Sequence, residues 1–355
     1  MAKLDIINLV YGEEYTRYFV DISLPSQLSA GNIPSLRERA ESVYHIYTTV
    51  TDFPLIEASP ALRLLSSLIK VNVVLITADE FRDPEYRAQK NINVYNVLID
   101  AHRHALNNTY NDHIMILSPD IIISDGSLRN IEQRLDEGYE AVMTLAPRAD
   151  KGKTLPQFQA MVTGNGDLTV SSRTLVDILI QHPHSVTQAL MHPVDWEVDV
   201  VTSWWPSIFI WQHPQIGLVC HSPHLHPIAI KRSAGNENFS GTIDNDYLMK
   251  FEPGSEKIYF PSSSDEILLI ECSSVSYESV PMLTPPVGIY FIARWFYQHV
   301  KPINFWFTTK PMVFLSSDSD SSALIEFIQK TIDRVNSLLS IVSFIFGKTE
   351  DRVQD

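Results

Sequence analysis

Apolar residues in the first 150 positions follow two alternating patterns. Short runs that are apolar almost throughout, such as 71–78 and 113–117, predict strands covered on both faces. Longer stretches with apolar residues three and four apart, such as 86–108, predict helices. The expected strands are 5–12, 42–50, 71–78, 113–120 and 139–148, and the expected helices begin at Glu13 and cover 54–70, 86–108 and 128–138. This rhythm predicts an α/β fold with a mostly parallel sheet flanked by helices.

The pattern changes after residue 150. KGKTLPQ predicts a loop, QAMVTGNGDLTV a hairpin, and SSRTLVDILIQHPH a helix with capping serines. Short strands are expected at 207–212, 216–220, 226–231, 257–260 and 266–273, and helices at 285–300 and 322–346. We therefore expect three consecutive parts: an α/β half at 1–150, a mixed α+β half continuous with it at 151–285, and C-terminal helices at 286–355.

Composition narrows the class of protein. Hydrophobic residues make up 45% of the 355 residues, which is enough for a large core. Lys and Arg number 27 against 42 Asp and Glu, a net charge of -15, which disfavours binding to nucleic acid. The two cysteines are too few for a disulfide scaffold, and no 18-residue apolar run is present. A cytoplasmic protein is expected.

Polar residues gather where the predicted strands end. In an open α/β sheet, ligands bind outside the carboxyl ends of the strands, where the loops converge. We therefore expect the residues at these ends to be neighbours that bind a ligand: Tyr11, Gly12, Thr48, Asp79, Ser118 and Asp120.

Ser118-Pro119-Asp120 separates the strand HIMIL from a second apolar run. This arrangement resembles the DXD motif of GT-A glycosyltransferases. The resemblance implies a GT-A/Rossmann-like fold, a nucleotide-sugar co-substrate, and a divalent metal, Mn²⁺ or Mg²⁺, at Asp120. The chain departs from the motif because Ser118 replaces the first Asp, so one carboxylate remains. The alternative is a tight turn in which Asp120 accepts backbone hydrogen bonds.

The segment HSPHLHP contains three histidines. His224 and His226 stand two residues apart, so in an extended segment they point to one face and can share a ligand. GT-A enzymes often use a late histidine as a metal ligand, and the resemblance therefore implies that Asp120, His224 and His226 bind the metal. The alternative is a structural role for these loop histidines.

Two later clusters contain carboxylates that could act in catalysis. FSGTIDNDYL carries Asp244 and Asp246, and HPVDWEVDVV carries Glu197; each of these carboxylates is a candidate catalytic base. Lys231 and Arg232 precede the first cluster and are expected to stabilise a leaving diphosphate. The alternatives are a solvated Asp-Asn-Asp turn and a tryptophan-rich core.

These residues favour one function and leave two others open. Tyr11 is expected to stack on the base, with Thr48 and Asp79 near uracil or ribose. The sequence lacks GxGxxG after the first strand, GxxxxGK[ST] and GxSxG. We expect a glycosyltransferase that moves a sugar to a saccharide or lipid-linked acceptor. The alternatives are a metal-dependent phosphoester hydrolase and an inactive sugar-nucleotide-binding assembly protein.

The apolar segment LLSIVSFIF at 338–346 ends the last predicted helix. It is expected to dock on the body of the protein, to form a homo-oligomer, or to make peripheral contact with the inner face of a membrane.

Overall fold

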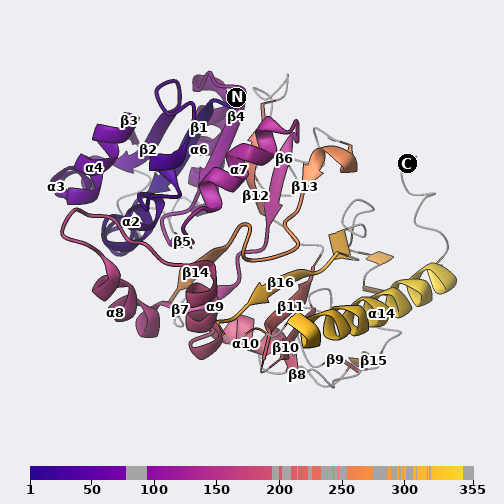
Figure 1. Cartoon of the computed structure of the whole chain (residues 1–355). Helices are drawn as coiled ribbons and strands as arrows, with labels where there is room; N and C mark the ends of the chain where they lie inside the picture. The colour runs from indigo at the N-terminus through magenta and orange to yellow at the C-terminus, as the bar shows by residue number, and fades with distance from the viewer. Residues whose placement is uncertain are drawn as a thin grey trace, which may run out of the picture. The chain divides into compact units, whose positions relative to one another are not determined.

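The computed structural model (Figure 1) divides into two compact units, each made of segments that are separated along the chain. It describes residues 1–76, 94–193, 200–201, 209–213, 215–222, 226–232, 243, 247, 254–274, 287–288, 294–295, 297–298, 300, 307–308, 310–317, 319 and 321–346. The first unit consists of Met1–Thr144, Leu155–Val170 and His226–Tyr259. The second consists of Leu145–Thr154, Ser171–Leu225 and Phe260–Asp355. The units thus alternate along the chain, whereas the sequence prediction divides it into three consecutive parts.

The first unit is built on a seven-stranded sheet in the order β13-β6-β12-β4-β1-β2-β3. Strand β12 runs antiparallel to both of its neighbours, β4 and β6, and the other pairs with β1, β2 and β6 are parallel. The strands are β1 (Leu4–Val10), β2 (Val43–Thr49), β3 (Lys70–Ile76), β4 (His113–Leu117), β6 (Ala141–Thr144), β12 (His226–Lys231) and β13 (Ile258–Tyr259). The predicted fold class, a mostly parallel sheet flanked by helices, is confirmed.

Helices cover both faces of this sheet. Neighbouring residues of β2 point to opposite faces. Tyr44 donates a hydrogen bond to Gln27 of α2 at 2.7 Å, while the Tyr47 hydroxyl lies 3.1 Å from Nδ1 of His104 in α6. Every residue of β1 is accordingly buried. The helices of this unit are α1 (Glu13–Tyr18), a π-helix (Phe19–Ser23), α2 (Leu24–Gln27), a 3₁₀ turn (Ile33–Ser35), α3 (Phe53–Ala58), α4 (Pro60–Leu68), α6 (Val94–Asn108), α7 (Ser127–Asp136) and a 3₁₀ turn (Ser255–Lys257).

Two helices differ from the prediction. The helix expected at 54–70 is divided into α3 and α4, because Ser59 and Pro60 end one helix and start the next. The Ser59 side chain caps α4 by accepting a hydrogen bond from the Leu62 amide at 3.1 Å. The loop predicted at 151–157 is wrong, since these residues begin α8 (Lys151–Met161). Asp150 supports its first turn by accepting a hydrogen bond from the Gly152 amide at 3.0 Å.

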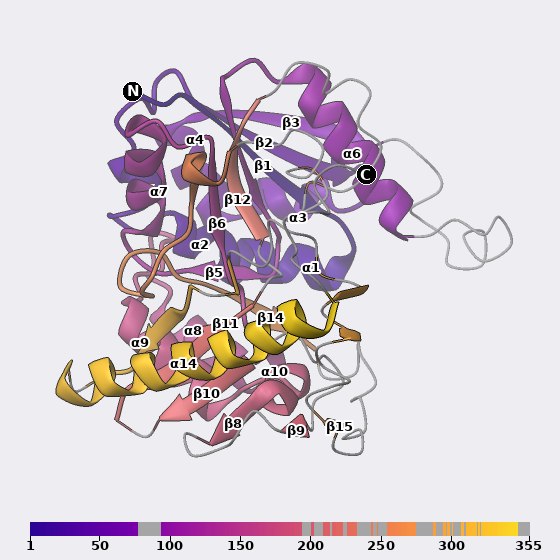
Figure 2. The ribbon, with the colours of Figure 1, turned by 90° about the vertical axis from the view of Figure 1, so that its right-hand side faces the viewer.

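The second unit contains a four-stranded sheet in the order β16-β11-β10-β8. The long helix α14 (Ser321–Phe346) lies across it (Figure 2) and buries Phe327, Val335, Leu338 and Val342 in a core with Trp211 and Val219. The other elements are β7 (Arg148–Asp150), α9 (Ser172–Gln181), α10 (Ser185–Leu190), β8 (Met191–Pro193), β9 (Val200–Val201), β10 (Phe209–His213), β11 (Gly217–His221), β14 (Leu269–Ser273), β15 (Val287–Gly288) and β16 (Met312–Leu315).

The C-terminal predictions have different outcomes. The helix expected at 322–346 is α14, and its apolar segment docks on the second unit through Leu338 and Val342. Within the helix predicted at 285–300, Val287 and Gly288 instead form β15, which pairs with β9, so that part of the prediction is wrong. Among the described residues, no helix combines the length and the apolar character needed to cross a membrane.

Candidate functional site

The predicted ligand-binding residues at the ends of β1, β2 and β4 lie at one edge of the sheet. In the parallel register Val10 lies opposite Thr48, and Asn8 lies opposite Leu117. Tyr11 and Gly12 follow β1, Thr48 lies near the end of β2, and Ser118 and Asp120 follow β4. The carboxyl ends of β1, β2 and β4 therefore form a continuous rim within the first unit, which we call the carboxyl edge.

Asp52 connects two loops of the carboxyl edge. Its Oδ2 accepts hydrogen bonds from the Gly12 amide at 2.9 Å and from the Thr49 hydroxyl at 2.6 Å. Gly12 has a φ of 83°, a backbone conformation that side chains disfavour, so a glycine suits this loop. Asp52 is not among the site residues that the sequence predicts, because it lies beyond the last residues of the predicted strand 42–50. The available signal was an acidic residue just beyond the end of a buried strand.

Thr48 contributes an unsatisfied hydroxyl near the same edge. The residue is fully buried, and within the described part of the chain its Oγ1 has no hydrogen-bond partner. Buried polar groups are nearly always paired with protein, water or ligand. The Thr48 hydroxyl therefore calls for a water molecule or a bound group beside β2.

Ser118 to Ile121 form the tight turn that the sequence allowed. The Ile121 amide donates to the Ser118 carbonyl at 3.3 Å, after which the chain continues as β5 (Ile121–Ile123). Ser118 is exposed and Asp120 is half-buried. The turn thus places the Asp120 carboxylate at the carboxyl edge, and a turn role and a ligand role for this residue are compatible.

The antiparallel strand β12 brings His226 to the carboxyl edge. His226 is its first residue, is exposed, and pairs with Thr144 at the end of β6. Because Ala229 pairs with Met115 and Lys231 with His113, the start of β12 borders the carboxyl end of β4. The structure therefore places His226 at the same end of the sheet as Ser118 and Asp120.

Lys231 and Arg232 lie at the other end of the same strand. Lys231 pairs with His113, the first residue of β4, and its ammonium group lies 3.5 Å from the Glu140 carboxylate. At about 3.3 Å per residue, roughly 17 Å of strand separates Lys231 from His226. The structure does not bring Lys231 and Arg232 to Asp120, and the expectation that they face a diphosphate there is corrected.

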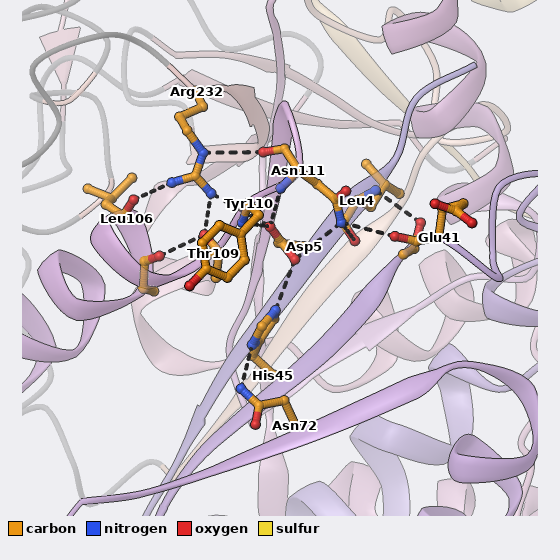
Figure 3. Close-up of polar contacts among 12 residues, drawn as sticks. Leu4, Asp5, Glu41, His45, Asn72, Leu106, Thr109, Tyr110, Asn111 and Arg232 are labelled. Carbon is orange, nitrogen blue, oxygen red and sulfur yellow. Dashed lines mark hydrogen bonds and ion pairs between the residues drawn. The ribbon is translucent and has the colours of Figure 1, made fainter.

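Arg232 instead belongs to a buried polar network around Asp5 (Figure 3). Its guanidinium group donates to the carbonyls of Asn111, at 3.2 Å, and Leu106, and to the Thr109 hydroxyl. It also lies 3.6 Å from the Asp5 carboxylate. These contacts fasten the end of β12 to the segment that precedes β4.

Asp5 is the centre of this network and is 2% exposed. Its Oδ1 lies 2.9 Å from Nε2 of His45, and its Oδ2 accepts from the amides of Tyr110 and Asn111, each at 2.8 Å. Asn72 of β3 lies 3.1 Å from the other His45 nitrogen, so the network crosses three strands. Burial raises the pKa of Asp5, but the hydrogen bonds from His45 and from the Asn111 and Tyr110 amides outweigh it and hold the pKa below its ordinary value.

The three histidines of HSPHLHP do not form one described cluster. His221 belongs to the second unit and is fully buried, with Nδ1 2.9 Å from the Thr308 carbonyl and Nε2 3.2 Å from the Thr331 hydroxyl. Burial lowers the pKa of His221 to about 4, which keeps the ring neutral. This histidine has the structural role that the sequence left open, whereas His226 lies in the first unit.

The remaining predicted site residues lie outside the described residues: Asp79, Glu197, His224, Asp244 and Asp246. Among the residues that the structure does describe, no group of three His, Cys, Asp or Glu side chains could hold a metal ion. Asp120 and His226 nevertheless supply an oxygen and a nitrogen donor at one edge, and Mn²⁺ accepts both donor types.

Comparisons with known proteins give distant likenesses. No protein-family model and no curated protein matches the sequence. The structure of S. aureus TarS 1-349 in complex with UDP-GlcNAc has a TM-score of 0.37 and 11% identity, over 94% of this chain and 73% of that one. Another S. aureus TarS structure has a TM-score of 0.26 and 16% identity, over 41% of this chain and 22% of that chain.

Mouse xyloside xylosyltransferase 1 in its apo form has a TM-score of 0.26 and 14% identity, over 44% of this chain and 58% of that one. The chain thus spans less than two thirds of this protein and about a fifth of the second TarS structure. All three TM-scores are below 0.5, so these likenesses do not establish a function for the chain.

Proposed function

We propose that the chain is a glycosyltransferase that binds a nucleotide-diphosphate sugar at the carboxyl edge of the first unit. The observation that carries the proposal is the convergence of Tyr11, Asp52, Asp120 and His226 at the ends of β1, β2, β4 and β12. An aromatic ring and a carboxylate suit the base of such a ligand, and an oxygen and a nitrogen donor suit a metal ion that would hold its diphosphate.

The β1 and β2 loops are proposed to hold the nucleoside. Tyr11 stacks on the base, and the Thr48 hydroxyl is satisfied by the ligand or by a water that it orders. Oδ2 of Asp52 is engaged by Gly12 and Thr49, whereas Oδ1 accepts no hydrogen bond from the described residues. That oxygen suits the imide N–H of uracil, a donor that a carboxylate pairs with well. Asp79 completes this part of the proposed site.

The β4 and β12 ends are proposed to hold the diphosphate through a divalent cation. Asp120 and His226 are the ligands, and His224 is a third. The cation supplies positive charge to the leaving diphosphate, as carboxylate-bound metals do in phosphate chemistry. This role replaces the one expected of Lys231 and Arg232, which the strand separates from Asp120.

The transfer itself exchanges one bond for another. The bond between the anomeric carbon and the diphosphate oxygen breaks, the acceptor oxygen bonds to that carbon, and the nucleoside diphosphate leaves with the bonding electron pair. In an inverting reaction Asp244, Asp246 or Glu197 takes the acceptor proton. In a retaining reaction the leaving diphosphate oxygen takes that proton, so no separate base is needed. We propose a saccharide or a lipid-linked sugar as the acceptor, and the latter would involve peripheral contact with a membrane.

A thermal-shift titration tests the proposal. Nucleoside diphosphates and their sugars are added with and without Mn²⁺, and a ligand at 100 times its Kd is expected to stabilise the fold by about 2.7 kcal/mol. Asp120→Asn and His226→Gln should abolish the Mn²⁺-dependent part, and Asp52→Asn should weaken binding of the nucleotide without Mn²⁺. Release of the nucleoside diphosphate during incubation with a donor then measures turnover.

Asp112→Asn is the matched control, since Asp112 is exposed at the opposite end of β4. It should leave both the shift and its dependence on Mn²⁺ unchanged. If no nucleotide stabilises the protein, or if Asp112→Asn and Asp120→Asn behave alike, the carboxyl edge is not the donor site.

A further inference from the structure

The second unit contains a cavity of about 510 Å³ that the proposed function does not use. It lies between strand β16, the first turns of α14 and the segment that begins at Phe260. Its apolar wall consists of Phe260, Pro311, Val313, Leu315, Leu324 and Ile328. The volume is within the range of about 300–1,000 Å³ that is typical of small-molecule sites.

The packing of α14 explains why the cavity exists. Phe327 is buried against the sheet, but Leu324 and Ile328, four residues apart on the helix, are only half-buried. On the opposite wall, Val313 and Leu315 are buried strand residues. Phe327 therefore lies in the core, whereas Leu324 and Ile328 pack against the core at its border and also line the cavity.

The walls are fixed before any ligand arrives. The Val313 amide donates to the Ser262 carbonyl at 2.9 Å, and the Ser264 amide donates to the Val313 carbonyl at 2.8 Å. The Ser264 hydroxyl in turn accepts from the Leu315 amide at 3.0 Å. These bonds attach the segment after Phe260 to β16, so a ligand would not have to order this wall.

Of the described residues that line the cavity, one is charged, and it is a cation. Lys310 lies two residues before β16, in a turn in which its amide donates to the Phe307 carbonyl at 2.9 Å. Ser262 and Ser263 add the other polar side chains of the wall. Desolvation lowers the pKa of Lys310, so its charge is less well hydrated here than in free solution. In a chain of net charge -15, a cation beside an apolar wall favours an anionic head group.

We propose that this cavity binds a small amphiphile with a single carboxylate, of the medium-chain fatty acid type. The hydrocarbon chain lies against Leu324, Ile328 and Phe260, and the carboxylate meets Lys310 with the hydroxyl groups of Ser262 and Ser263. The site shares no residue with the carboxyl edge, since all its lining residues belong to the second unit.

Isothermal titration of the full chain with decanoate, decanol and decylamine tests the proposal. Decanoate is expected to bind at one saturable site, decanol more weakly, and decylamine least. Lys310→Met should weaken decanoate about tenfold and leave decanol unchanged, because the loss is that of a charge-assisted contact. Lys330→Met is the control: Lys330 pairs with Glu326 on the exposed side of α14 and should bind like wild type.

A second variant separates loss of the site from loss of the fold. Leu324→Trp places a larger apolar side chain in the cavity, so decanoate and decanol binding should disappear while the melting temperature is kept. Equal binding of decanoate and decanol, with no effect of Lys310→Met, would reject the anionic ligand. Absence of saturable decanoate binding to the wild type, or normal binding to Leu324→Trp, would reject the cavity as the site.

Discussion

Replacing Asp5 by Asn tests whether the buried network holds the amino end of the first sheet together. The Asp5 carboxylate receives hydrogen bonds from the Tyr110 and Asn111 amides on one oxygen and contacts His45 through the other. Asn keeps the shape of Asp but has one acceptor oxygen, so either the two amides or His45 must face an NH₂ group. A buried donor without an acceptor loses about 1–3 kcal/mol, and Arg232 also loses its nearby counter-charge. We expect Asp5→Asn to lower the free energy of unfolding by about 3 kcal/mol.

Urea denaturation followed by circular dichroism measures this loss. At neutral pH the midpoint should fall while the m-value stays constant, since the same surface is exposed. The pKa of Asp5 is below its ordinary value of 3.8, so the stabilisation from its charged form is present above pH 3.8 and is lost as the pH falls through the folded-state pKa. The difference between wild type and Asp5→Asn should therefore shrink at the acid end.

The control for this measurement is Asp112→Asn, which changes an exposed carboxylate near the same end of the sheet. It is expected to change the free energy of unfolding by less than about 0.5 kcal/mol. A loss below about 1 kcal/mol in Asp5→Asn, or a difference that grows on acidification, would contradict the reasoning.

Three further variants are expected to act through single features. Gly12→Ala should cost about 1–3 kcal/mol in urea denaturation, because the φ of 83° strains a residue with a side chain; an unchanged midpoint would contradict this. Protonation of His221 should remove up to about 3 kcal/mol of stability as the pH drops from 6.5 to 4, because its pKa in the fold is about 4 and the unfolded chain takes up the proton first. His221→Leu should reduce the acid slope by this amount and leave the part due to His102, whose pKa burial also lowers to about 4; an unaltered slope would contradict this. Ser59→Ala should cost about 1 kcal/mol by uncapping α4, as thermal melting would show, whereas an equal melting temperature would mean that the cap is redundant.

The parallel sheet could be predicted because the share of apolar residues in a strand shows whether one or both of its faces are buried. A strand covered on both faces is mostly apolar, and β1 is buried at every position, with Asp5 and Asn8 as its polar exceptions. Once those strands are parallel, their ends must share an edge, and so Tyr11, Thr48 and Asp120 could be grouped from the sequence. The grouping needed no knowledge of helix packing.

The place of β12 could not be predicted in the same way. Its sequence reads as a short buried strand, but the choice of neighbours depends on open edges of β4 and β6 that lie about a hundred residues earlier. His226 and Lys231 are close in the sequence and were therefore assigned to one site. An extended strand separates such residues instead, and the strand direction decides which of them reaches Asp120.

The start of α8 is a second element that the local sequence does not predict. Gly152 and Pro156 lower helix propensity, which favours the predicted loop. The Asp150 carboxylate supports the first turn by accepting the Gly152 amide, an interaction that local propensity does not include. The cap supports the start of the helix but, at about 1 kcal/mol, does not by itself offset a proline that costs about 3 kcal/mol in a helix interior.

The central position of β12 has a consequence for synthesis on the ribosome. Strands β4 and β6 are complete by residue 144, yet the strand that joins them begins at His226. In the nascent chain, the backbone N–H and C=O groups along one side of β4 and of β6 must therefore stay unpaired while more than eighty further residues emerge. Strands that are so far apart in the sequence pair slowly. The first unit is therefore expected to complete its folding late in translation and to depend on chaperones that cover the unpaired sides of β4 and β6 until β12 has been synthesised.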